Sequence, residues 1–250
     1  MPLHYIDNNR LGTDGKISTR DGREIIISGR SKNFASSALW EASAPGSNTN
    51  AKALYGTDFS VNGDGNFREL RTDPWGSPAL VWVSKNNDTA SDADGGWNKN
   101  VYGINPTRKH LSFVYFRRVS SSSNGRFYHG CAPNTENLDG VLHPNPYFNY
   151  PLLAVLVKNK WYLSIGVIHE AGYTGGYSGL AGVYLVNGGN GVKELTSYEY
   201  RNAGVTRQLH RTFLYYSTEP QDEVEWWGLG FYEMDGTEPP LSQLLTGFTQ

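Results

Sequence analysis

The segment 160–169 constrains the fold more than any other part of the chain, because its residues alternate with the two-residue period of a β-strand. Between residues 161 and 167, Trp, Leu, Ile and Val would lie on one face, and Tyr, Ser and Gly on the other. This pattern predicts a strand that is covered on one side. A loop rich in glycine and tyrosine follows at 170–179. Tyrosine offers a large contact area at low entropic cost and glycine allows close backbone approach, so such a loop is typical of a surface presented to a partner.

Strand-like runs bounded by Gly, Asn, Asp and Pro recur from residue 65 onward. Several of them are apolar or aromatic on both faces, so one face would fill a core and the other would line a groove or a subunit contact. Short strands at this spacing predict an all-β fold of the sandwich type. The expected strands are 66–71, 79–84, 110–119, 125–131, 152–157, 160–169, 182–186, 206–217 and 225–233.

The first 58 residues differ from the rest in being polar and rich in turn residues, with one clear strand expected at 24–28. We therefore expect a mostly irregular N-terminal segment for attachment or oligomerisation, residues 1–58, and a β-sandwich domain, residues 59–250. A single helix is expected after residue 240, where leucines at 241, 244 and 245 have helical spacing behind a Thr-Glu-Pro-Pro start.

Composition excludes several classes of protein. The net charge is −2 and the sequence pI about 6.3, with Lys and Arg scattered, so nucleic acid is not an expected partner. The chain shows neither a long apolar run nor the basic and apolar blocks of a secretory signal, so we expect a soluble protein made in the cytosol, without membrane insertion. Cys131 is the only cysteine, which excludes an intrachain disulfide and zinc sites of the paired-Cys type.

Five aromatic side chains are candidates for stacking against a sugar: Trp97, Tyr173, Tyr177, Trp226 and Trp227. A pyranose presents an apolar C–H face that a flat ring can cover while polar neighbours bond its hydroxyls. Local packing is the alternative for each ring. Trp226 and Trp227 are adjacent, so in a strand they would face opposite ways and at least one would belong to the core.

Asp88, Asp92 and Asp94 precede a double glycine, and hard oxygen ligands on a tight turn are what Ca²⁺ requires. The spacing departs from the EF-hand loop, whose first and twelfth positions correspond here to Ala90 and Val101. A solvated turn rich in Asp and Asn is the alternative. Ca²⁺ is the only cofactor that the sequence suggests.

Catalytic signatures are weak. Glycoside hydrolysis needs two carboxylates facing across a sugar, and acidic residues at 223, 225, 233 and 235 lie close in sequence, but such clustering is also typical of a solvated strand end. Histidines at 129, 143, 169 and 210 are scattered without an HExxH pattern, so we interpret them as structural. No Walker loop, G-x-S-x-G motif or dinucleotide fingerprint occurs. We assign no catalytic residue and expect a protein that is not an enzyme.

Several sequence blocks occur in a characteristic order and spacing over roughly residues 60–245. They are NDTASDADGGW at 87–97, LSFVYFRR at 111–118, NGRFYHGC at 124–131, NLDG at 137–140, NPYF at 145–148, WYLSIGVIH at 161–169 and MDGTEP at 234–239. Together they resemble a domain of tail fibres and other virion structural proteins of tailed bacteriophages. The resemblance implies a jelly-roll-like β-sandwich akin to carbohydrate-binding modules, carried on a virion, often as a trimer, with no enzymatic activity required. Residues 1–58 lie outside the likeness.

The preferred function is recognition of host-surface glycans by a virion protein such as a tail fibre, with weak contacts summed over a homotrimer. The expected partners are further copies of the chain, other virion proteins through residues 1–58, and host cell-surface polysaccharide. Two alternatives stay open. One is a capsid decoration or purely architectural protein, and the other is a depolymerase or lyase that cleaves the polysaccharide.

Overall fold

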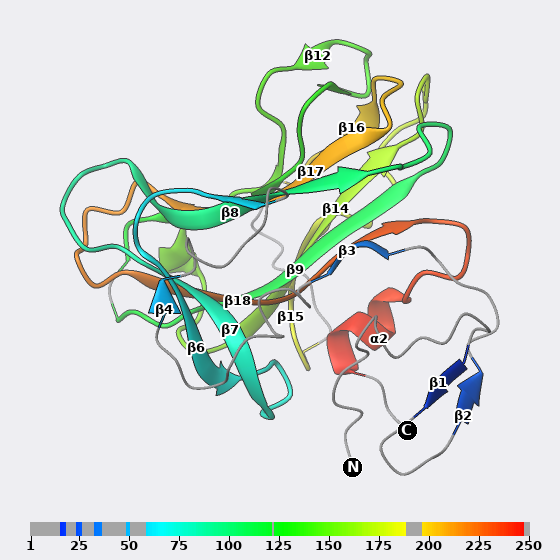
Figure 1. Ribbon diagram of the computed structural model, residues 1–250. Helices are drawn as coiled ribbons and strands as arrows, with labels where there is room; N and C mark the ends of the chain where they lie inside the picture. Colours follow the sequence, from blue (N-terminus) through cyan, green and yellow to red (C-terminus); the bar gives the residue numbers. More distant parts are fainter. Residues whose placement is uncertain are drawn as a thin grey trace.

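The computed structural model describes residues 59–121, 123–188 and 197–247, together with four short strands within the first 50 residues. In these residues two hydrogen-bonded sheets stack as a β-sandwich (Figure 1). The smaller sheet has the strand order β13-β10-β17-β8-β5. Its strands are β5 (Phe59–Val61), β8 (Ala93–Tyr102), β10 (Arg126–Gly130), β13 (Tyr147–Asn149) and β17 (Arg207–Tyr215).

The larger sheet has the order β12-β11-β16-β14-β9-β18-β7-β6-β4, with β15 beside β14 and β3 beside β18. Its described strands pair antiparallel except β14 and β16, which are parallel. The all-β sandwich expected from the sequence is confirmed. The strands are β3 (Asn33–Ser36), β4 (Thr49–Asn50), β6 (Asn66–Thr72), β7 (Pro78–Lys85), β9 (His110–Arg118), β11 (Thr135–Glu136), β12 (Leu142–His143), β14 (Trp161–His169), β15 (Gly182–Leu185), β16 (Glu199–Asn202) and β18 (Glu223–Glu233).

Strands also occur in the N-terminal segment. β1 (Lys16–Ser18) and β2 (Glu24–Ile26) pair with each other, whereas β3 pairs with β18 and β4 with β6. The larger sheet therefore takes strands from both sides of the boundary expected at residue 58. The rest of residues 1–58 lies outside the described residues, and the attachment role of this segment stays a prediction.

Aromatic rings fill the space between the two sheets. The centroid of Trp97 lies 4.9 Å from that of Trp82 and 5.6 Å from that of Trp226. Phe116 of the larger sheet stacks on Phe127 of the smaller sheet, with centroids 3.8 Å apart. All five rings are fully buried. Burial of apolar rings of this size is the main force that holds two such sheets together.

A second apolar cluster covers the outer face of the larger sheet, where helix α2 (Leu241–Thr246) packs (Figure 1). Leu244 and Leu245 of α2 share this cluster with Leu163 and Ile165 of β14. The helix expected from the leucine spacing is confirmed. β14 is buried along its whole length, so the prediction of one covered face was wrong. Because α2 covers this face from within the chain, strands that are apolar on both faces do not require a partner subunit.

The expected strands are all present except 152–157. This segment contains a single turn of 3₁₀ helix, η3 (Leu153–Val155). Leu153 and Leu156 are buried, whereas Leu152 and Val155 are exposed. Buried positions three residues apart match the period of a 3₁₀ helix and not that of a strand.

Strand β8 was not expected, because its Asp, Asn and Gly residues are typical of turns. Gly95 and Gly96 adopt φ angles of 152° and 112° inside this strand. A Cβ atom at Gly96 would lie 2.1 Å from the carbonyl oxygen of Thr212 on β17. The double glycine that was read as a tight turn thus allows β8 to approach its neighbour closely.

Buried polar side chains link the two sheets. The ring nitrogens of His129, on the smaller sheet, lie 3.0 Å from Ser112 Oγ and 2.9 Å from Ser164 Oγ, both on the larger sheet. Asn149 Nδ2 donates hydrogen bonds to Ser164 Oγ (3.0 Å) and to the carbonyl oxygen of Ile165 (2.8 Å). Buried polar groups that are satisfied in this way fix the relative position of the elements that carry them.

Substitution of Gly166 tests the packing of β14 against the smaller sheet. A Cβ atom at Gly166 would lie 2.1 Å from the ring of Phe148, which is fully buried. We expect Gly166→Ala to lower the free energy of unfolding by about 1–3 kcal/mol in denaturant titrations, because the core must overpack. Gly176→Ala is the control, since nothing lies within 4 Å of its Cβ position. Equal stability of the two variants would contradict the packing described.

Buried histidines predict a loss of stability in acid. Burial lowers the pKa of His110 and His210 from 6.5 to about 4, and that of His129 well below 6.5. At these three histidines the unfolded chain therefore binds more protons than the folded chain below pH 6.5. They outnumber Asp94, whose raised pKa of about 7 acts in the opposite direction, so stability falls as the pH drops from about 6.5 toward 4. Melting temperatures measured across this range should decrease progressively. A melting temperature that stays constant between about pH 7 and about pH 4.5 would contradict this assignment.

Candidate functional site

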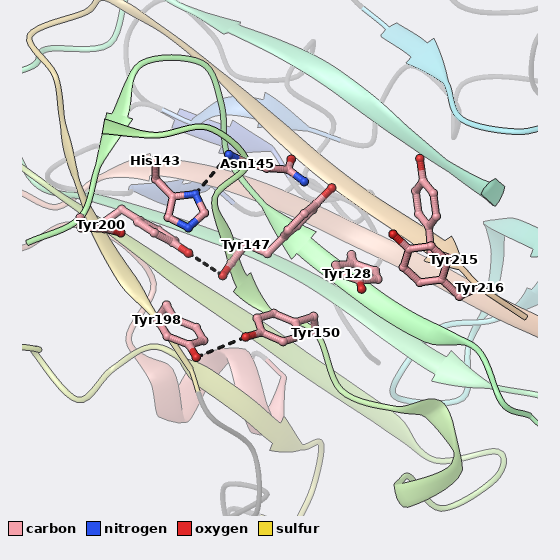
Figure 2. A pocket seen from close by; sticks show the side chains of 10 residues that line it. Tyr128, His143, Asn145, Tyr147, Tyr150, Tyr198, Tyr200, Tyr215 and Tyr216 are labelled. Atoms are coloured by element: carbon pink, nitrogen blue, oxygen red, sulfur yellow. Dashed lines mark hydrogen bonds between the residues drawn. The ribbon is translucent and has the colours of Figure 1, made fainter. Parts of the chain in front are cut away.

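A cleft of about 520 Å³ lies where the outer face of the smaller sheet meets β16 (Figure 2). Tyrosine dominates its lining, and the remaining lining residues are two asparagines and one histidine. The lining consists of Tyr128, Asn137, His143, Asn145, Tyr147, Tyr150, Tyr198, Tyr200, Tyr215 and Tyr216. We call this the tyrosine cleft.

Core packing turns three of the tyrosines outward. Tyr128 on β10, Tyr147 on β13 and Tyr215 on β17 each neighbour in sequence a residue of the buried core. These core neighbours are Phe127, Phe148 and Leu214. Successive side chains of a strand point to opposite faces, so burying the core neighbour directs the tyrosine away from the core. Because β13, β10 and β17 are adjacent in the sheet, the three rings meet on its outer face.

Tyr128 is the centre of the ring cluster. Its centroid lies 4.7 Å from that of Tyr147, 5.9 Å from those of Tyr150 and Tyr215, and 6.2 Å from that of Tyr216. The ring of Tyr150 is nearly parallel to that of Tyr128, whereas the other three stand at steep angles to it. Figure 2 shows Tyr128 between these neighbours. The cleft thus offers flat apolar surfaces in several orientations.

Hydrogen bonds and burial raise the pKa of several phenols of the cleft. Tyr150 Oη donates to Tyr198 Oη at 3.2 Å, and Tyr200 Oη donates to the carbonyl oxygen of Tyr147 at 2.9 Å. The hydrogen bond with Tyr198, together with burial, raises the pKa of Tyr150 to about 12. Burial raises the pKa of Tyr128 and Tyr147 as well. These groups stay neutral near pH 7, so they can donate as well as accept hydrogen bonds.

The segment that carries β11 and β12 supplies the polar side of the cleft. His143 Nδ1 accepts a hydrogen bond from the backbone N–H of Asn145 at 3.1 Å, so in the neutral ring Nε2 carries the proton. Burial and the nearby Arg211 lower the pKa of His143, which favours the neutral ring near pH 7. The side chains of Asn137 and Asn145 add amide donors and acceptors to the lining. A few polar groups among many rings are typical of a small-molecule or saccharide site.

Positive charge lies beside the cleft, and none of its ten lining residues is acidic. The Arg211 guanidinium lies 4.2 Å from the ring centroid of Tyr147, and its Nη2 donates to the carbonyl oxygen of Pro146 at 2.9 Å. Arg126 Nη1 donates to the carbonyl oxygen of Tyr150 at 3.2 Å. Both guanidinium groups therefore place positive charge next to the residues that line the tyrosine cleft.

The three predicted tryptophans do not line the cleft. Trp97 and Trp226 are 0% exposed, so their prediction as sugar-stacking rings was wrong, because the packing of the two sheets buries both. Trp227 faces the opposite way from Trp226, as expected for adjacent residues of a strand. It packs in the outer cluster, with ring centroids 5.4 Å from Trp75 and 5.6 Å from Tyr115. The expectation that at least one of the adjacent pair belongs to the core is confirmed.

Tyr173 belongs to the glycine- and tyrosine-rich loop, and a buried hydrogen-bonded pair, His169 and Glu199, lies beneath its ring. Its ring stacks on that of His169, with centroids 3.9 Å apart. His169 Nε2 donates to Glu199 at 2.7 Å, and Ser178 donates to the same carboxylate through Oγ (2.6 Å) and N–H (2.7 Å). Although burial opposes ionisation, these hydrogen bonds hold the pKa of Glu199 at about 2. Tyr173 therefore has one face used for packing.

Tyr177 is the predicted ring that is most available for contact. Its side chain is 61% exposed. Burial chiefly raises the pKa of Tyr200, and the nearby phenol of Tyr177 adds to this rise. Tyr177 is not among the residues that line the tyrosine cleft.

The predicted calcium ligands are not gathered as a site. Asp94 is buried and accepts a hydrogen bond from the backbone N–H of Ser217 at 3.0 Å, and burial raises its pKa to about 7. Asp88 Oδ1 caps its own turn by accepting the N–H of Ala90 at 2.8 Å. Across the described part of the chain, no group of three or more His, Cys, Asp or Glu side chains is placed to hold a metal ion, Asp92 included. Calcium binding stays a prediction without a ligand set.

The acidic residues near the start of β18 are used in ion pairs on the larger sheet. Glu223 lies 3.0 Å from Lys85 Nζ. Glu225 pairs with Arg117 Nε and lies 3.7 Å from Arg71 Nε. Burial raises the pKa of Glu225, and the Arg117 guanidinium opposes this rise. These carboxylates do not line the tyrosine cleft, so the cleft lining supplies no acid pair for hydrolysis.

None of the five predicted rings lines the cleft, and the sequence analysis missed all seven tyrosines that do. The available signal was the alternation of tyrosine with core residues in β10, β13 and β17. Of the four histidines interpreted as structural, those at 129, 169 and 210 are buried and hydrogen-bonded, whereas His143 lines the cleft.

Comparison with known proteins gives a likeness of fold. No family model matches the chain, and no curated protein matches it. A CBM22-1 xylan-binding domain from Paenibacillus barcinonensis Xyn10C aligns at 10% identity and a TM-score of 0.38, covering 82% of this chain and 97% of that domain. The CBM22-1-GH10 modules of Clostridium thermocellum Xyn10B align at 7% identity and a TM-score of 0.41, covering 83% of this chain but only 30% of that one. At these values the likeness carries no argument about function.

Among the residues that the structure describes, no helix has both the length and the apolar character needed to cross a membrane.

Substitution of Trp97 distinguishes a core ring from a binding ring. We expect Trp97→Ala to lower the free energy of unfolding by about 3–5 kcal/mol, because it removes the contacts with Trp82 and Trp226. Tyr177→Ala should change stability by less than about 0.5 kcal/mol, because that ring is exposed. Denaturant titration of both variants measures the difference. A Trp97→Ala variant as stable as the parent chain would contradict its place in the core.

Proposed function

We propose that the tyrosine cleft binds a polysaccharide without cleaving it, and that the chain serves as a host-recognition component of a phage virion, such as a tail fibre. The observation that carries the binding proposal is the concentration of seven tyrosines in one cleft of about 520 Å³. A ring face can cover the C–H face of a sugar, while the phenol and amide groups around it bond the sugar hydroxyls.

The exposure of two tyrosines supports their use as sugar-stacking rings. Tyr216 is 49% exposed at the rim of the cleft and adopts a positive φ of 64°, which is uncommon for a residue with a large side chain. An unfavourable backbone conformation that presents an aromatic ring is typical of a functional position. Tyr177 is exposed on the loop that precedes β15, and in this proposal it adds a contact along the polymer.

The virion assignment rests on the sequence blocks that resemble tail-fibre and other virion proteins. In this proposal several copies of the chain, as a homotrimer, present equivalent clefts to one surface, and weak sites add up to a stable attachment. Residues 1–58 dock the assembly to other virion proteins.

A purely architectural role is the alternative that a specific observation favours. Val141 and Leu142 are 61% and 60% exposed next to His143, and tyrosine is enriched where proteins meet. In that case a neighbouring subunit would cover the cleft in the assembled particle. Imaging of the particle with this chain labelled separates the two roles, because recognition requires the cleft to face outward.

Removal of the central ring tests the binding proposal. We expect Tyr128→Ala to weaken binding to host-surface polysaccharide by about tenfold, because the ring contacts four other tyrosines of the cleft. Affinity electrophoresis through gels that contain the extracted polysaccharide measures the effect. Tyr102→Ala is the control, because Tyr102 is 54% exposed at the end of β8 and does not line the cleft.

Equal loss in both variants, or no loss in either, would contradict the placement of the site. Release of shortened polysaccharide by the parent chain would contradict the proposal of binding without cleavage. Circular dichroism of each variant checks that the fold is kept.

A further inference from the structure

The arginines of this chain differ in how their charge is balanced. Arg71, Arg108, Arg117 and Arg201 each form an ion pair with a glutamate. Arg126 and Arg211, beside the tyrosine cleft, pair with no carboxylate among the described residues. An arginine without a counter-charge beside a cleft without acidic lining creates a positive potential in that cleft.

Arg126 is placed to contact a ligand in the cleft. It lies two residues before Tyr128 on β10, so both side chains project from the same face of the sheet. Its charge opposes the burial-driven rise in the pKa of Tyr128, and it has the same effect on Tyr150, which places the guanidinium near both phenols. A guanidinium has five N–H donors, and one hydrogen bond, from Nη1 to the carbonyl oxygen of Tyr150, is formed within the described residues.

Arg211, which is more deeply buried, adds to the positive potential in the cleft. Its side chain is almost fully buried against the ring of Tyr147, and its Nε has no hydrogen-bond partner among the described residues. A buried cation without a carboxylate is costly, and an anion on the other side of the ring would reduce that cost. Burial lowers the pKa of His143, and the charge of Arg211 adds to this effect, so the positive potential extends to the polar side of the cleft.

We infer that the tyrosine cleft selects an acidic polysaccharide, whose carboxylate or sulfate groups are bound by the guanidinium of Arg126. This inference rests on the proposed function of the cleft and names the class of its ligand. The fork of N–H groups on arginine matches the two oxygens of a carboxylate or the oxygens of a sulfate ester, while the tyrosine rings cover the sugar. In this inference Arg211 contributes positive electrostatic potential and does not contact the ligand.

Matched polymers separate charge from sugar shape. Polygalacturonate and its fully methyl-esterified form share one backbone but differ in charge, and dextran sulfate and dextran form a second pair. We expect affinity electrophoresis of the full chain to show binding of the acidic member of at least one pair, at least about tenfold tighter than binding of its neutral partner. Binding should weaken with added salt.

Two substitutions test the role of Arg126. Arg126→Gln should weaken binding of the acidic polymer by about tenfold or more, whereas Arg126→Lys, which keeps the charge but lacks the fork, should retain part of it. Arg207→Gln is the matched control. Arg207 lies on the same sheet and also pairs with no carboxylate in the described region, but it contacts Asn100 and Tyr102, outside the cleft. This control should bind like the parent chain.

The outcomes distinguish this inference from the proposed function. Tighter or equal binding of the neutral polymers, unchanged in Arg126→Gln, would overturn the selection of an acidic ligand and leave the glycan-binding cleft in place. If neither these polymers nor host-surface polysaccharide bind, both proposals fall. Equal losses in Arg126→Gln and Arg207→Gln would show a general charge effect and would also overturn the role of Arg126.

Discussion

Trp82, Trp97 and Trp226 pack against one another between the two sheets, and this contact determines which face of each strand points inward. Once it is fixed which alternate residues of each strand face the core, Phe127 must point into the core and Tyr128 must point out of it. The same argument applies along β13 and β17. The tyrosine cleft is therefore a consequence of how the core is packed: along β10 and β13, Phe127 and Phe148 are used inside, and Tyr128 and Tyr147, with their polar tips, lie on the outer face.

Two further features make the outer face suitable for a saccharide. Burial and hydrogen bonding raise the pKa of Tyr128, Tyr147 and Tyr150, so each of these rings combines an apolar face with a neutral group that donates and accepts hydrogen bonds. The carboxylates are held elsewhere, Glu225 with Arg117 on the larger sheet and Glu199 with His169 behind the loop of Tyr173. Arg126 and Arg211 are thus left as the charges that act on the cleft.

The sequence predicted the parts of the fold that depend on local pattern. Strands such as β9, β14 and β18 were found from their apolar residues, and α2 from its leucine spacing. β8 could not be found in this way, because its glycines serve close contact with β17, which is distant in sequence. The cleft was missed for the same reason. Its tyrosines span 128–216 and meet because β13, β10 and β17 are neighbours in one sheet and β16 of the other sheet adjoins them. The isolated signal of a tryptophan in a glycine-rich segment, Trp97, marked a core position instead.

The measurement that tests the central claim most directly is hydroxyl-radical footprinting of the chain with and without saturating polysaccharide. The claim is that the rings on the outer face of the smaller sheet bind the ligand while the tryptophans of the core support them. We predict that Tyr128, Tyr147 and Tyr216 become protected from oxidation, and that Trp97 and Trp226 are unreactive in both states. Protection confined to the face that carries Trp227, with the cleft tyrosines unchanged, would contradict the account.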